Sequence, residues 1–153
     1  MNATALMSPV ALPMPLLPEN PGAEPQSLVM AVELGLLAQR WRRRWPELRL
    51  SLPAGGTWPL LSWPEALQQA LDTLLADAVE WQDDAAVALG LGLQRGALRV
   101  DLDGDDAQAR RWLPRALLAA QRLAAWQGGR LRWRTSGNHW KVRLELPLSP
   151  ARR

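Results

Sequence analysis

The sequence predicts an α/β two-layer sandwich, in which about three helices cover one face of a mixed β-sheet. Three segments carry apolar residues at helical spacing, at 27–45, 64–81 and 108–127. Short stretches between and after them alternate apolar and polar residues, which is typical of strands. The chain of 153 residues is long enough for one domain with a substantial core.

The N-terminal segment 1–26 is expected to be a Pro-rich, disordered tail, because proline sustains neither a helix nor a central strand. Six of the 13 prolines lie there, at positions 9, 13, 15, 18, 21 and 25. Such a segment can also be a ligand for another domain, although a plain tail is the simpler interpretation. Residues 149–153 are expected to be a short basic tail, which leaves 27–148 as the folded domain.

The first helix is expected over 27–45, with Ser27 as its cap and Pro46 as its stop. Its last turn is basic, which suits the negative end of the helix dipole. The basic residues are Arg40, Arg42, Arg43 and Arg44. Strands are expected at 48–52 and 58–61, on either side of a turn.

The second helix is expected over 64–81, with Pro64 in its first turn and Asp77 at the edge of its apolar stripe. Alternating segments then predict a hairpin over 87–102, which ends at the polar turn 103–106.

The third helix is expected over 108–127, ending at Gly128-Gly129. Three arginines lie on its outer face, at Arg111, Arg115 and Arg122. A last hairpin, 131–146, completes the sheet.

Composition excludes several classes of function. The chain has no cysteine and one histidine, His139, so a thiolate site, a Ser-His-Asp triad and a multi-histidine metal site are not expected. No apolar run is long enough to span a bilayer and no secretory signal begins the chain, so a cytoplasmic protein is expected. The net charge of +3 favours acidic partners weakly.

Residues 63–81 resemble the helix of histidine-kinase ATPase domains that carries the catalytic asparagine. The family pattern is roughly D-P-x-R-L-x-Q-x-L-x-N-L-L-x-N-A, with an aromatic residue three positions later. The matching residues are Pro64, Leu67, Gln69, Leu71, Leu74, Leu75, Ala78 and Trp81. Segments 117–131 and 142–147 are similar to the family's last helix and closing strand. The resemblance covers about 27–148 and implies the fold of the gyrase and histidine-kinase ATPase superfamily.

The polar residues of that family are altered here. Thr73 and Asp77 stand where the pattern has asparagines, and Thr73 also replaces the glutamate base of the hydrolysing members. Weak binding of Mg-ATP is the alternative to having no cofactor. In that case the resemblance implies that Asp77 would hold the magnesium ion. Asp103 would accept the adenine amino proton, although strand register places it one residue early and the second glycine of its loop is missing.

The family's glycine-rich phosphate turn should fall at 112–115. Trp112 adds bulk there, and Pro114 removes a backbone N–H. Little room remains for a nucleotide lid between Asp106 and the last helix. No dimerising hairpin with a phosphoacceptor histidine precedes residue 27, and His139 falls in an expected turn, so a kinase reaction is not expected.

The sequence therefore favours a degenerate domain, a pseudokinase that serves as a non-catalytic regulatory or adaptor module and has no cofactor. Its expected partner is an acidic protein, such as a response regulator, kinase or sigma factor, contacted by the two sets of arginines. Two alternatives stay open: a divergent ATP-binding domain of a kinase or anti-sigma factor, and a nucleic-acid-binding module.

Overall fold

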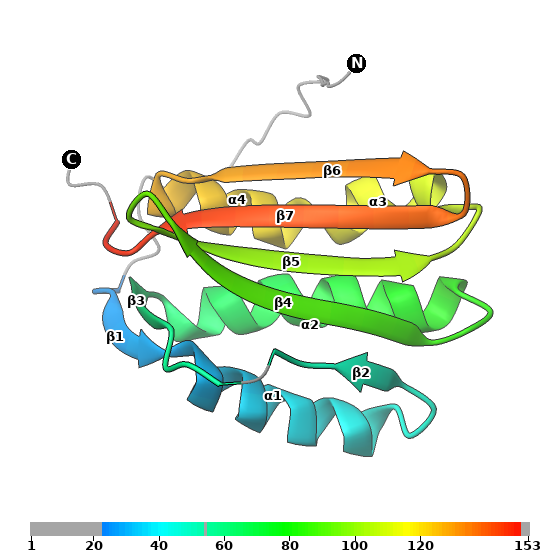
Figure 1. The fold of residues 1–153 in the computed structure, drawn as a ribbon, viewed down its shortest axis with the longest axis horizontal. Coiled ribbons are helices and arrows are strands. Elements are labelled where there is room, and N and C mark those ends of the chain that lie inside the picture. Colours follow the sequence, from blue (N-terminus) through cyan, green and yellow to red (C-terminus); the bar gives the residue numbers. More distant parts are fainter. Residues whose placement is uncertain (1–22, 54, 151–153) are drawn as a thin grey trace.

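The structure is a computed structural model that describes residues 23–53 and 55–150 (Figure 1). Most of the expected N-terminal tail, and residues 151–153 of the expected basic tail, lie outside this part. The main sheet has five strands in the order β2-β4-β5-β7-β6. These are β2 (Arg49–Ser51), β4 (Ala86–Gln94), β5 (Ala97–Asp105), β6 (Arg130–Ser136) and β7 (His139–Pro147). Only β2 and β4 pair in parallel, so the sheet is mixed, as expected.

Four helices accompany this sheet in the described part of the chain, and they confirm the two-layer prediction. They are α1 (Met30–Arg44), α2 (Pro64–Trp81), α3 (Ala109–Ala116) and α4 (Leu118–Gln127). Figure 1 looks onto the open face of the sheet, with α2, α3 and α4 behind it. No helix in the described ranges is long and apolar enough to cross a membrane.

The start of the first helix differs from the prediction. Residues 26–29 form strand β1 (Gln26–Val29), which pairs antiparallel with β3 (Pro59–Ser62) in a small separate sheet. Ser27 therefore lies in a strand, and the residue before the helix is Val29, which makes no side-chain cap bond. The pairing with β3 prevails over the local capping signal and buries Leu28 in the core.

The expected third helix is in fact two helices. Leu117 adopts φ −94° and ψ 1°, which separates α3 from α4. Pro114 lies inside α3 and donates no backbone hydrogen bond, so this helix is weakened from within. The glycine stop is confirmed, because Gly128 takes the left-handed conformation at the end of α4.

The core lies between the helices and one face of the sheet. Because side chains alternate along a strand, β5 directs Leu98, Val100 and Leu102 into the core and its intervening residues toward the open face. Strand β7 contributes a second buried row, Trp140, Val142, Leu144 and Leu146. The helices thus cover an apolar face, and the other face is polar.

Candidate functional site

Asp77 lies on α2 beside the buried stripe of that helix, and its side chain is partly buried. Burial raises the pKa of Asp77, and the negative charge of Glu80 raises it further. The positive charge of Arg115 lowers it. Asp77 is therefore a carboxylate in the helical layer, close enough to α3 to interact with one of its arginines.

Asp103 lies on the other side of the sheet. Its strand neighbours Leu102 and Gly104 are buried toward the helices, so its own side chain points to the open face. There it stands opposite Lys141, and its Oδ1 lies 3.9 Å from Nε2 of His139. The sheet separates Asp103 from Asp77, so the structure does not bring these two sequence-predicted site residues together.

Gly104 occupies the inward position at the end of β5. A Cβ atom added there would lie 2.7 Å from Oε1 of Gln82 and 2.8 Å from the ring of Trp140. Contacts this short are too close for a side chain, so no larger residue fits without movement of its neighbours. The inner side of the polar turn 103–106 is therefore filled by the protein itself.

Two tryptophans, Trp112 and Trp140, lie beside this turn together with Gln82. The rings of Trp112 and Trp140 pack edge to face, with centroids 5.6 Å apart and planes at 81°. Trp140 donates its Nε1–H to Oε1 of Gln82, and Trp112 donates its Nε1–H to Oδ2 of Asp106 at 2.6 Å. The sequence analysis placed Trp112 in the expected phosphate turn, and it did not single out Trp140 or Gln82. The apolar alternation of the last strand could have placed Trp140 inside.

The segment expected at the place of a phosphate turn is helical. Residues 112–115 lie inside α3, which begins three residues after Asp106. The backbone N–H of Gln108, the residue just before α3, donates to Oδ1 of Asp106 at 3.2 Å. Thr73 also makes local bonds, since its hydroxyl lies 3.0 Å from the carbonyl oxygen of Gln69 on its own helix.

The arginines expected at a partner surface are mostly exposed. Arg42, Arg43 and Arg44 are exposed on α1 and form no ion pair among the described residues, and the Arg44 guanidinium lies 4.9 Å from the centre of the Trp45 ring. Arg40 is exposed as well, but it pairs with Asp72 of α2 at 2.5 Å.

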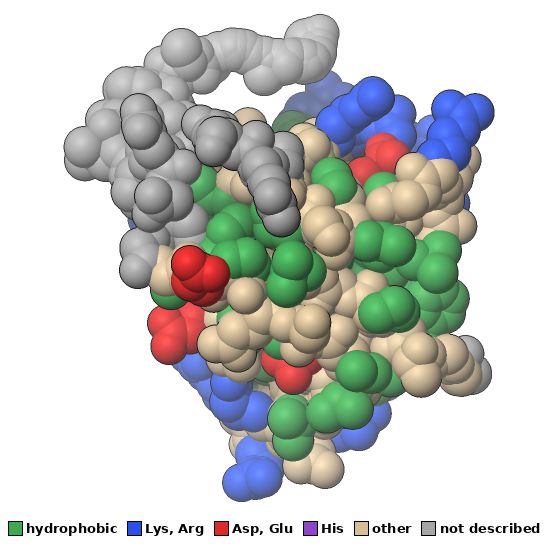
Figure 2. Space-filling model, turned by 90° about the vertical axis from the view of Figure 1, so that its left-hand side faces the viewer, with side chains coloured by type: hydrophobic (Ala, Val, Ile, Leu, Met, Phe, Trp, Pro, Cys, Tyr) green, Lys and Arg blue, Asp and Glu red, His purple; other side chains and the backbone are tan. Residues whose placement is uncertain are grey.

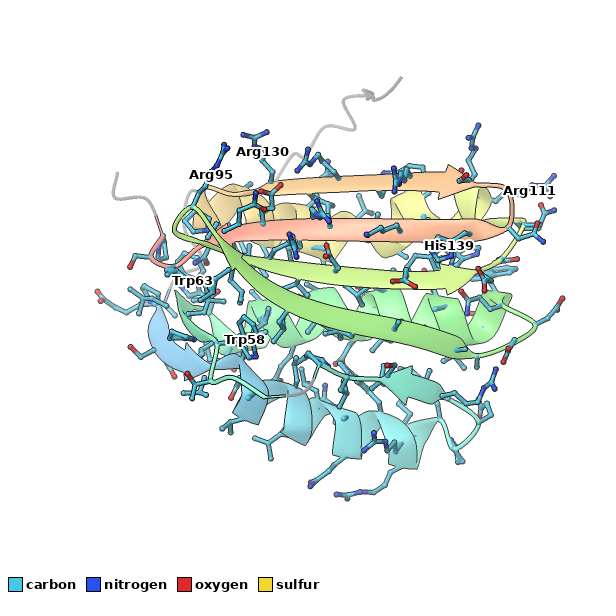
Figure 3. All side chains as sticks on the ribbon, in the orientation of Figure 1. Trp58, Trp63, Arg95, Arg111, Arg130 and His139 are labelled. Atoms are coloured by element: carbon cyan, nitrogen blue, oxygen red, sulfur yellow. The ribbon has the colours of Figure 1, made fainter. Side chains whose placement is uncertain are left out.

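On the third and fourth helices, Arg111 and Arg115 are exposed, and Figure 3 shows Arg111 at the end of the molecule where α3 begins. Arg122 is the exception to the expected exposure. It is half-buried on α4, and its Nε has no hydrogen-bond partner among the described residues.

Two surface hollows of about 320 Å³ each lie near the small β1–β3 sheet. One adjoins Trp58 and the other adjoins Trp63, two residues labelled in Figure 3. Figure 2 looks onto this end of the molecule and shows hydrophobic side chains interspersed with polar ones. Neither hollow is lined by Asp77 or Asp103, and no cluster of three potential metal ligands occurs within the described ranges.

Comparisons with known proteins place the fold. No protein-family model and no curated protein matches the sequence. The ATP-binding domain of PrrB from Mycobacterium tuberculosis is 22% identical, with a TM-score of 0.69 over 84% of this chain and 100% of that one. The catalytic domain of the histidine kinase ThkA is 11% identical, with a TM-score of 0.70 over 84% of this chain and 100% of that one.

The histidine kinase domain of the E. coli osmosensor EnvZ is a third similar structure. It is 15% identical, with a TM-score of 0.67 over 86% of this chain and 93% of that one. This chain therefore has the fold of histidine-kinase ATP-binding domains, as the resemblance of residues 63–81 implied.

Proposed function

We propose that this domain is a non-catalytic regulatory or adaptor module that keeps the histidine-kinase ATPase fold and binds an acidic protein partner. The observation that carries the proposal is that protein side chains fill the space behind the turn 103–106. Trp112 and Trp140 occupy this space, and Asp106, the last acidic residue of the turn, accepts a bond from Trp112. A nucleotide base would have to displace a packed aromatic pair to enter.

The residues that would bind the phosphates and magnesium of Mg-ATP are also unsuitable. Residues 112–115 lie inside helix α3 and not in a glycine-rich loop, and Pro114 has no backbone N–H to offer. Asp77 is a suitable magnesium ligand by chemistry, but it would add negative charge beside three phosphates. Asp103 faces the opposite side of the sheet. These residues do not form a set that fits Mg-ATP.

The partner class rests on charge and on the fold. Arg42, Arg43 and Arg44 are exposed on one helix, and Arg111 and Arg115 on another. The structures with this fold include kinases of two-component signalling, so a response regulator, a kinase or a sigma factor is the expected kind of partner. Binding through these exposed arginines should weaken with salt, mainly through a slower association rate.

One observation supports a rival function, a divergent ATP-binding domain. Asp77 is partly buried on the helix that resembles the family's asparagine helix, and its pKa is raised. Perturbed carboxylates of this kind are common at functional sites. The third candidate, a nucleic-acid-binding module, rests on the arginines and the tryptophans.

Calorimetric titration with Mg-ATP separates the proposal from its rival. The adaptor function predicts no binding tighter than about millimolar, or roughly −4 kcal/mol. Micromolar binding that Asp77→Ala abolishes would establish the rival. A mobility-shift assay with DNA and RNA tests the third candidate. Sub-micromolar retention that the charge reversal of Arg42 and Arg43 abolishes would replace the adaptor function with nucleic-acid binding.

A further inference from the structure

Strand β6 is a free edge of the main sheet. It pairs with β7 on one side, and no described segment pairs with its other side (Figure 1). In an edge strand, every second residue directs its backbone N–H and C=O away from the sheet. The seven residues of β6 therefore offer an unpaired row of donors and acceptors to another strand.

Arginines line the open-face side of this edge at every second position. Arg130, Arg132 and Arg134 are all exposed, and Figure 3 shows Arg130 projecting from the edge. Arg132 pairs with Glu145 of β7 at 2.5 Å. Arg130 and Arg134 form no ion pair within the described part of the chain, and Arg134 stands opposite Lys141 in the register. The edge thus carries surplus positive charge.

The other side of the same strand is apolar. Trp133 lies there with 39% of its surface exposed, next in the row to the partly buried Leu131. A strand added to this edge would place alternate side chains beside the arginines and the others beside Trp133. The pattern selects a ligand in which acidic and apolar residues alternate.

A second copy of this chain is a poor occupant of the edge. Pairing β6 with β6 would set arginine against arginine, and like charges directly opposite each other are destabilising. A nucleic acid would neutralise the arginines, but it would leave the row of backbone groups without a strand partner. Charge and backbone together favour an acidic peptide.

We propose that β6 is a docking edge for an extended acidic peptide, which adds to the sheet as a sixth strand beside Arg130–Ser136. This inference rests on the proposed function, because it adds a second surface, besides the exposed arginines of α1 and α3, through which the adaptor module holds its partner. Backbone bonds supply affinity in this mode of binding, and alternate side chains supply specificity.

The test uses a synthetic, fluorescein-labelled peptide of alternating glutamate and valine and measures its anisotropy against the full chain. The expected result is saturable binding that weakens with salt. Charge reversal of Arg130 and Arg134 together should weaken it at least about tenfold. These two arginines form no described ion pair, so circular dichroism should show an unchanged fold. The control reverses Arg49, which is exposed on β2 at the opposite edge of the sheet, and should leave affinity within about twofold.

Backbone methylation of the peptide tests strand addition itself. In an added strand, only every second backbone N–H faces β6. N-methylation of the residues whose N–H groups face β6 should therefore abolish binding, and N-methylation of the intervening residues should not. Equal binding by both methylated peptides would overturn the proposal, as would no measurable binding of the parent peptide. An equal loss in the Arg49 control variant would also overturn it.

Single-stranded DNA is the competing ligand in the same assay. If it binds more tightly than the peptide and loses affinity with the Arg130 and Arg134 reversal, the edge is a nucleic-acid site and the proposal fails. If neither the peptide nor Mg-ATP binds, the docking edge is rejected and the adaptor function stays in place. Micromolar Mg-ATP binding rejects the adaptor function, whatever the peptide does.

Discussion

Replacing Trp140 by phenylalanine should destabilise the domain strongly. Trp140 is 0% exposed, packs edge to face on Trp112 and donates its indole N–H to Oε1 of Gln82. Phenylalanine keeps one aromatic ring but lacks the N–H and the second ring. The substitution therefore removes a donor and leaves a void at the centre of the aromatic filling.

The size of the stability loss depends on whether Gln82 can find another hydrogen-bond donor. This residue is 6% exposed, and its amide nitrogen donates to the carbonyl oxygens of Asp84 and Ala86 at 3.0 and 3.3 Å. The side chain is held by these bonds and cannot turn its oxygen to water. An unsatisfied buried acceptor costs about 1–3 kcal/mol, and the void adds about 1 kcal/mol. Trp140→Phe should therefore lower the free energy of unfolding by about 2–4 kcal/mol.

Guanidinium denaturation followed by circular dichroism measures this loss, because fluorescence would average over nine tryptophans. Trp133→Phe is the matched control, since Trp133 is 39% exposed at the sheet edge. The control should change stability by no more than about 0.5 kcal/mol. A Trp140→Phe variant as stable as the control would refute the view that this aromatic cluster is a packed and satisfied part of the core.

Three further predictions concern pH, a buried amide and a close approach. Burial raises the pKa of Asp77, so the contribution of this one carboxyl to stability falls as pH rises from its usual value of 3.8 through the folded-state pKa. Asp77→Asn should be more stable at pH 7, by less than about 1 kcal/mol, and the difference in denaturant midpoint should vanish below pH 3.8. Gln127→Leu leaves two backbone carbonyls and a buried hydroxyl without their partner, and chemical denaturation should show a loss of about 2–4 kcal/mol. Gly129→Ala would place a Cβ 1.9 Å from the carbonyl oxygen of Glu145 and should lower the melting temperature sharply, whereas Gly90→Ala meets nothing within 4 Å and should not.

The regular elements were predictable from local signals. Helix α2 begins at Pro64 and ends at Trp81, as its first-turn proline and apolar spacing predicted. The two long hairpins followed from alternation and short turns. These features are encoded within a few residues of each other, so the sequence pattern carries them fully.

The elements that the sequence did not predict depend on residues far apart in the chain or on the backbone conformation of a single residue. Strand β1 has four residues, and its partner β3 lies some thirty positions further on, so no local pattern separates it from the helix that follows. The break between α3 and α4 depends on the backbone at Leu117. The orientation of Asp103 was available from the sequence, because an inward Val100 and Leu102 place it on the open face.

Stability in the presence of Mg-ATP tests the central claim most directly, because any ligand that binds the native chain raises its free energy of unfolding. With about 5 mM Mg-ATP, a millimolar dissociation constant gives a gain of roughly 1 kcal/mol, and a micromolar constant gives roughly 5 kcal/mol. The filled space behind Gly104 predicts a gain of no more than about 1 kcal/mol. The same gain is predicted for Asp77→Ala. A gain near 5 kcal/mol that Asp77→Ala removes would contradict the account and establish a working nucleotide site.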